Sequence, residues 1–299
     1  MPQHRHTLAA PVTIHGTGLF TDQPSAITIS PATPGTGIAF EIDSARTAAH
    51  INNLSTAPAH PAFAKLPPRC TTIDLRQPDG SARPLFTVEH VLSALVGLGV
   101  HDAAISCDGP ETPILDGSAL DFVTAIQAVG LVRTDTPPER ITPRRQVTVE
   151  DGRGGSVTIE PIGAEEPPSY TYHLDYGPDS PIAKASVTWD GSADQYAKLV
   201  APARTFCLEA EAEQMHSLGL FKNLTPRDML VIGPAKGDHP AGPIDNAYRM
   251  NDEPAWHKLL DLIGDLALVG TPLHAKVTAH KSGHALHHAA ALAVVNALP

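Results

Sequence analysis

Short runs of alternating hydrophobic and polar residues occur in both halves of the chain and predict β-strands. Residues 26–30 read AITIS and residues 156–160 read SVTIE, with isoleucine or valine at every second position. In such a strand one face packs on a core and the other meets water. The strands expected from these patterns are 26–30, 37–42, 70–75, 101–107, 147–150, 156–160, 170–174 and 273–279.

Longer segments carry apolar residues three and four positions apart, which predicts amphipathic helices. Ser118 and Asp121 form a capping box before one of them, and Ser192 and Gln195 form another. The segment 253–269 is apolar over most of its circumference, so we expect this helix to be largely buried. Helices are expected at 87–98, 118–129, just after Ser192, 208–218, from Thr225-Pro226 onward, 253–269 and 285–298.

A polar, proline-rich segment separates the two halves. Residues 131–145 read LVRTDTPPERITPRR and show no apolar period, which is typical of a linker. We expect an N-terminal domain over residues 1–132, a linker over 133–145 and a C-terminal domain over 146–299. Each half combines strands with two or more helices, so the expected fold class is α+β, with a β-sheet packed against helices in each domain.

Composition and charge exclude several classes of protein. Hydrophobic residues make up 42% of the 299 positions, which is enough for a folded core, and the formal net charge of −11 disfavours nucleic-acid binding. The longest apolar run, residues 289–295, is far shorter than the ~20 residues of a membrane-spanning helix. Three cysteines without CxxC spacing, and no secretory signal, predict a cytoplasmic location. We expect a monomer that acts on a small molecule.

Histidine is unusually frequent, because 16 histidines outnumber the 7 Phe, 2 Trp and 5 Tyr residues combined. Two of them stand beside carboxylates within apolar helical segments. His257 and Asp261 lie one helical turn apart, and His90 follows Glu89. Taken singly, the first pair is better explained by a structural hydrogen bond, and the second by a surface turn in which Glu89 has a favourable place near a helix N-terminus.

A further histidine ends the motif Lys281-Ser-Gly-His284, between a predicted strand and a predicted helix. A side chain at such a junction can face a cleft, although it can also be an ordinary loop residue. The nearby His287 and His288 are expected to be surface residues. Asp265, two turns after His257, is placed to orient a histidine.

Together these segments contain the parts of a catalytic zinc site. Such a site has three protein ligands and one open position for water, and His90, His257 and Asp261 would supply two imidazoles and a carboxylate. Zinc lowers the pKa of its bound water to about 7. Glu89 could then accept a proton, and His284 could protonate a leaving group.

Five ordered motifs make the sequence similar to a known enzyme family. They are TVEHVLSAL at 87–95, ETPILDGS at 111–118, ARTF at 203–206, HKLLDLIGD at 257–265 and KSGHAL at 281–286. The chain resembles the UDP-3-O-acyl-N-acetylglucosamine deacetylases, zinc enzymes of the committed step of lipid A synthesis. The similarity runs from Gly16 to the final helix.

The resemblance implies a fold of two similar α+β domains with the active site between them. It implies hydrolysis of the N-acetyl group of the UDP-linked sugar, with release of acetate. By position it implies zinc ligands His90, His257 and Asp261, base Glu89, acid His284, its supporting carboxylate Asp265, a hydroxyl from Thr205, and substrate contacts Lys258 and Phe206. Because the protein is acidic, a diphosphate needs local positive charge, for which Lys258 and Arg204 are candidates.

Two positions depart from the family pattern. Phe20 stands where the family usually has a histidine near the nucleotide diphosphate, and residues 222–225 read KNLT where a Gly-Gly-Ser often lines the acyl passage. These departures keep open a related zinc deacetylase that acts on a different acylated amino sugar. A non-catalytic zinc-binding homologue is a further alternative, although all of the inferred catalytic positions are occupied.

Overall fold

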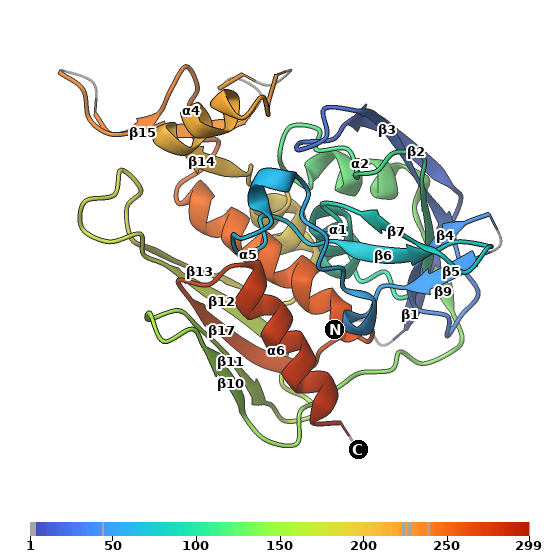
Figure 1. The fold of residues 1–299 in the computed structure, drawn as a ribbon. Helices are drawn as coiled ribbons and strands as arrows, with labels where there is room; N and C mark the ends of the chain where they lie inside the picture. Colours follow the sequence, from blue (N-terminus) through green and yellow to red (C-terminus); the bar gives the residue numbers. More distant parts are fainter. Residues whose placement is uncertain (1–3, 44, 223–224, 227–228, 238–239, 299) are drawn as a thin grey trace.

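Two five-stranded sheets form the outer layers of the molecule, and its long helices lie between them (Figure 1). This computed structural model describes residues 4–298 except 44, 223–224, 227–228 and 238–239. The expected α+β class is confirmed. Among the helices that the structure describes, none is both long enough and apolar enough to span a bilayer. Cys70, Cys107 and Cys207 are all free thiols.

The first sheet is built from residues of the N-terminal half. Its neighbours are antiparallel except for β4 and β8, which pair in parallel. In spatial order its strands are β2 (Val12–Thr17), β3 (Pro24–Pro31), β8 (Ala103–Cys107), β4 (Ile38–Ile42) and β5 (Ala45–Ala48).

The second sheet repeats the arrangement of the first. Its single parallel pair, β12 with β17, again joins the third strand to the fourth. In spatial order its strands are β10 (Val147–Glu150), β11 (Ser156–Pro161), β17 (Ala275–His280), β12 (Ser169–Leu174) and β13 (Ala185–Trp189). The two halves of the chain therefore share one topology.

The helices follow the same repeat. In the first half, α1 (Glu89–Gly97) precedes β8 and α2 (Leu120–Val129) follows it. In the second half, α5 (Glu253–Leu266) precedes β17 and α6 (His284–Asn296) follows it. Helices α5 and α6 pack on the second sheet and α2 packs against β2, whereas α1 packs chiefly on α5.

The remaining elements are short. A two-stranded pair joins β1 to β9, another joins β6 to β7, and a small sheet of β14, β15 and β16 carries α4. Their bounds are β1 (Arg5–Leu8), η1 (Ile51–Asn53), η2 (Pro61–Phe63), β6 (Ile73–Arg76), β7 (Ala82–Leu85), β9 (Leu131–Thr134), α3 (Ala193–Gln195), η3 (Tyr196–Val200), β14 (Phe206–Leu208), α4 (Glu209–Ser217), β15 (Leu230–Gly233), β16 (Gly242–Pro243) and η4 (Ala267–Val269).

All of the expected strands overlap observed ones, but three local predictions need correction or fall outside the structure. Helix α2 begins at Leu120 and not at Ser118. The Ser118 hydroxyl accepts the N–H of Leu120 at 3.2 Å, and not that of Asp121 as a capping box would require. The expected linker 133–145 begins inside β9, whose apolar residues are exposed and show no alternation. The helix expected from Thr225-Pro226 extends into positions outside the described residues.

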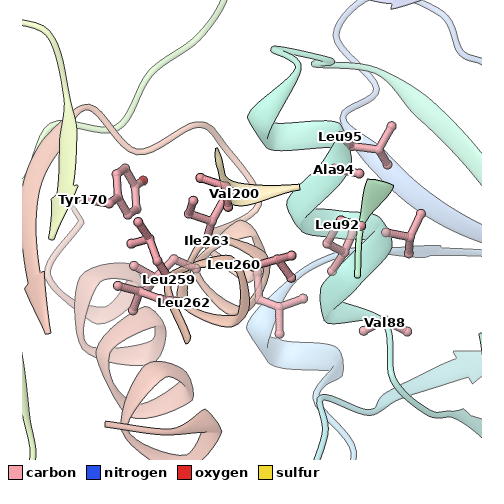
Figure 2. Close-up of a cluster of buried hydrophobic side chains, with 14 of the residues drawn as sticks. Val88, Leu92, Ala94, Leu95, Tyr170, Val200, Leu259, Leu260, Leu262 and Ile263 are labelled. Carbon is pink, nitrogen blue, oxygen red and sulfur yellow. The ribbon is translucent and has the colours of Figure 1, made fainter. Parts of the chain in front are cut away.

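The contact between α1 and α5 forms the centre of the core (Figure 2). Leu92 of α1 and Leu260 and Ile263 of α5 are fully or almost fully buried there. The helices approach so closely because α5 presents Gly264: a Cβ built at this position would lie 2.1 Å from the carbonyl oxygen of Glu89. The start of α1 is thereby held against the last turn of α5.

We predict that Gly264→Ala separates these helices and destabilises the protein by about 1–3 kcal/mol, because the added methyl group cannot fit against rigid backbone. Denaturant unfolding followed by circular dichroism measures the loss. Gly163→Ala is the matched control, since its methyl group would meet only Glu166, at an ordinary 3.6 Å. Equal stability of the two variants would contradict the close helix contact.

Candidate active site

The first turn of α1, the first half of α5 and the start of α6 face one cavity of about 400 Å³. Residues from both halves of the chain therefore meet at one place. The titratable side chains that these three helices place on the cavity wall include Glu89, His90, His257, Asp261 and His284.

His90, His257 and Asp261 form a compact group of potential metal ligands. One ligand atom of each lies within 4.8 Å of the other two. Asp261 Oδ1 is 3.4 Å from His257 Nε2 and 3.8 Å from His90 Nε2. His257 Nδ1 lies 3.0 Å from the carbonyl oxygen of Ala203, so Nδ1 carries the proton and Nε2 presents a lone pair to the group.

Burial determines the charge state of this group. It lowers the pKa of His90 to about 3, with a further contribution from His257, and it lowers the pKa of His257 as well. Burial alone would raise the pKa of Asp261, but Lys258 and the histidines hold it well below its usual range. Neutral imidazole and ionised carboxylate are the forms that bind metal ions.

The donor set and its spacing fit a catalytic zinc ion. Zinc bonds of ~2.0–2.2 Å to nitrogen and oxygen bring ligand atoms to roughly 3–4 Å from one another, as the two measured distances are. The cavity leaves an open side for water or substrate. Nε2 is the ring nitrogen that His90 presents to Asp261, whereas its Nδ1 is buried without a hydrogen-bond partner among the described residues.

Lys258, Phe206 and Thr205 also line the cavity. Lys258 Nζ lies 2.8 Å from Asp261 Oδ2 and 5.6 Å from the centre of the Phe206 ring. Burial alone would lower the pKa of Lys258, but the Asp261 carboxylate raises it, so the ammonium group stays charged. The Thr205 N–H donates to the Gly117 carbonyl oxygen at 2.6 Å, which ties Thr205 to the loop before α2.

Glu89, His284 and Asp265 form a second functional group beside the first. His284 Nε2 is 3.9 Å from Glu89 Oε1, and its Nδ1 donates to Asp265 Oδ2 at 2.8 Å. Burial raises the pKa of Glu89 to about 8, although His284 opposes the shift. Burial alone would lower the pKa of His284, but Asp265 raises it to about 9. The raised pKa makes the ionised Glu89 carboxylate a stronger base than an exposed glutamate, and the imidazolium of His284 beside it favours that ionised form.

A family model for LpxC, described as UDP-3-O-acyl N-acetylglycosamine deacetylase, matches residues 5–296. The chain belongs to the LpxC family. This confirms the resemblance seen in the sequence motifs, and it covers the halves that contribute to the cavity.

Relatives that bear the name UDP-3-O-acyl-N-acetylglucosamine deacetylase are similar over most of their length. The protein of Synechocystis sp. is 34% identical over 288 residues, which cover 94% of this chain and 95% of that protein. The protein of Hydrogenovibrio crunogenus is 31% identical over 292 residues, with coverage of 95% and 88%. That of Thermosynechococcus vestitus is 33% identical over 292 residues, with coverage of 97% and 93%.

One expected substrate contact of this LpxC chain is not placed at the cavity. Arg204 is 5% exposed and does not line the cavity wall. Its guanidinium pairs with Glu253 at 2.8 Å and also donates to Asn246 and the carbonyl oxygen of Ala247. The structure therefore does not bring Arg204 to the cavity with the other predicted residues, because its hydrogen-bonding capacity is used inside the protein. Among the described residues, the lysine and arginine side chains on the cavity wall are Lys258, Arg69 and Lys281.

The expectation that His287 and His288 are surface residues is wrong. They are 0% and 7% exposed, and His287 Nδ1 donates to Asp265 Oδ2 at 2.7 Å. His284, His287 and His288 are three and four residues apart, so they share one face of α6. That spacing was the available signal. Nothing in the local sequence pointed to Thr71, whose hydroxyl also donates to Asp265.

Of the two departures from the LpxC pattern, the structure describes Phe20 but only part of residues 222–225. Phe20 lies on the cavity wall and packs against Phe63 and Phe221, with ring centres 5.6 and 6.1 Å away. An apolar surface therefore occupies the place where the family usually has a histidine. Within residues 222–225, Asn223 and Leu224 lie outside the described residues.

We predict that Arg204→Leu lowers the free energy of unfolding by about 3–5 kcal/mol, because it leaves the Glu253 carboxylate buried and unpaired. Denaturant unfolding measures this loss. The double variant Arg204→Leu/Glu253→Leu should recover much of it. The exposed Arg153→Leu serves as control. A large rise in KM with unchanged stability would instead support a substrate contact.

Proposed function

We propose that the protein hydrolyses the N-acetyl group of UDP-3-O-acyl-N-acetylglucosamine to the free amine and acetate, the committed step of lipid A synthesis, with zinc as its metal. The observation that carries this proposal is the meeting of two residue groups in one cavity of an LpxC chain: the His90–His257–Asp261 donor set and the Glu89–His284 pair. We also propose that the protein is a monomer located in the cytoplasm.

His90, His257 and Asp261 would hold the zinc ion. Bound zinc polarises a carbonyl group and lowers the pKa of a water molecule to about 7. Two neutral imidazoles and one carboxylate leave a net positive charge on such a site. Lys258, bonded to the outer oxygen of Asp261, fixes the orientation of that carboxylate.

Glu89 and His284 divide the proton transfers. Glu89 accepts a proton from the attacking water as the new C–O bond forms on the acetyl carbon. His284 gives a proton to the amide nitrogen as the C–N bond breaks, so the sugar leaves as a neutral amine. The carboxylate of Asp265 keeps His284 protonated before this step.

The remaining wall residues suit the rest of the substrate. The Thr205 hydroxyl is proposed to donate to the developing oxyanion. Lys258, Arg69 and Lys281 supply positive charge for a diphosphate. Phe20, Phe63, Phe221, Met215 and Met229 belong to one buried apolar cluster that reaches the same cavity, which suits an acyl chain.

Phe20 favours one alternative, a deacetylase that acts on a different acylated amino sugar. The phenyl ring of Phe20 offers no hydrogen bond to a phosphate, whereas a histidine would. Side-by-side assays of UDP-linked and UDP-free substrates separate the two functions, because the proposed enzyme requires the nucleotide. A non-catalytic zinc protein would turn over neither substrate.

We predict that Glu89→Gln lowers kcat by about 10²–10⁴-fold, because the amide keeps the shape of the side chain but cannot accept the proton of water. The metal content, measured by atomic emission, should stay that of the wild type. His257→Ala is the matched variant and should lose metal. If Glu89→Gln lost the metal instead, Glu89 would be structural.

Treatment with a chelator should abolish acetate release, because the three ligands are proposed to hold an ion that the reaction requires. Addition of Zn²⁺ should restore the activity. Acetate release by the wild type is followed before, during and after dialysis against the chelator. Activity that persists after complete metal removal would overturn the metal mechanism.

A further inference from the structure

Thr71 links Glu89 to Asp265, the carboxylate that holds His284. Its backbone N–H donates to Glu89 Oε2 at 3.0 Å, and its hydroxyl donates to Asp265 Oδ1. Its carbonyl oxygen accepts the N–H of Val88, the residue before α1, at 3.1 Å. Thr71 is completely buried and lies just before β6, outside every motif that the sequence analysis singled out.

The hydrogen-bond directions around Asp265 follow from counting protons. The ionised carboxylate accepts only, so His284 and His287 must each donate from Nδ1, at 2.8 and 2.7 Å. The Thr71 hydroxyl gives its single proton to Asp265, so its contact of 2.8 Å with His288 needs the proton on His288 Nε2. His284, His287 and Thr71 therefore all donate to one buried carboxylate, and His288 donates to Thr71.

The Thr71 hydroxyl is the intermediate link of this arrangement. It accepts from His288 on one side and donates to Asp265 on the other. Without it, Asp265 Oδ1 would lose its direct donor, since His288 Nε2 is 3.7 Å from that oxygen. The carboxylate could then rotate, and the ring of His284, which depends on Oδ2, would rotate with it.

We infer that Thr71 is a positioning residue for the deacetylation: it fixes Asp265, and through Asp265 the imidazole of His284, relative to Glu89. This inference rests on the proposed function, which gives Glu89 and His284 their roles. Thr71 does not line the cavity, so it acts without touching substrate. A misplacement of about 1 Å in such a group can cost about 10²-fold in rate.

Three substitutions isolate the hydroxyl. Thr71→Val removes it and keeps the shape and both backbone hydrogen bonds, whereas Thr71→Ser retains it. Thr72→Val is the matched control, because the neighbouring Thr72 is also buried, and among the described residues its hydroxyl contacts Cys70 Sγ, at 3.8 Å, and no part of the site. Each variant is purified with its metal, and its metal content and thermal unfolding are recorded.

Thr71→Val should lower kcat roughly 10- to 100-fold with KM and metal content unchanged, and Thr71→Ser should recover most of the loss. Thr72→Val should behave as the wild type. An activity-independent readout is the low-field proton NMR signal of His284 Nδ1–H, which should shift in Thr71→Val and return in Thr71→Ser.

Wild-type kcat in Thr71→Val, or a loss that Thr71→Ser does not recover, would overturn the inference. If Thr71→Val does not fold, His288→Leu and His288→Gln take its place: the first should lower kcat, and the second, which keeps a donor, should restore it. A wild-type protein that releases no acetate refutes the proposed function instead. In that case the His284 signal decides the inference, and an unchanged signal in Thr71→Val overturns it.

Discussion

The close contact of α5 with the start of α1 is the constraint on which the rest of the structure depends. A glycine at position 264 lets the backbone of Glu89 lie directly on α5, and the apolar residues beyond it extend this contact into the core. Each of these helices belongs to one copy of the repeated sheet topology. This helix pair is the most extensive contact between the two repeats, and it carries the first turn of α1 to the ligands of α5.

Buried charge is the second organising feature. The site places Glu89, Asp261 and Asp265 in the interior, and each carboxylate has a defined partner: Lys258 for Asp261, three donors for Asp265, and the Thr71 N–H for Glu89. An isolated buried carboxylate is costly, whereas a hydrogen-bonded one can be held in a fixed orientation. The hydrogen bonds that offset the cost of burying these carboxylates also fix the orientation of the reactive atoms.

The sequence was sufficient where the information was local. His257 and Asp261 share a helical turn, and the five motifs indicate the family, so the sequence alone predicts the residues proposed for catalysis. The pairing of Arg204 with Glu253 cannot be predicted in this way, because the two residues are distant in sequence and such a pair leaves no local pattern. The contacts of Thr71 with Asp265 and His288 are equally distant in sequence. Strand β9 cannot be predicted from the sequence pattern, because its exposed residues show no alternation of apolar and polar side chains.

The repeated topology has a consequence for how the site comes into being. The donor set is divided between the two repeats, so neither repeat carries it alone, and it exists only where the two repeats are in contact. Any ion that binds these three residues binds the fully assembled state in preference to the separated halves. By mass action, such an ion shifts the equilibrium toward assembly. The equilibrium between separated and assembled repeats then determines both the stability of the protein and the presence of its catalytic site.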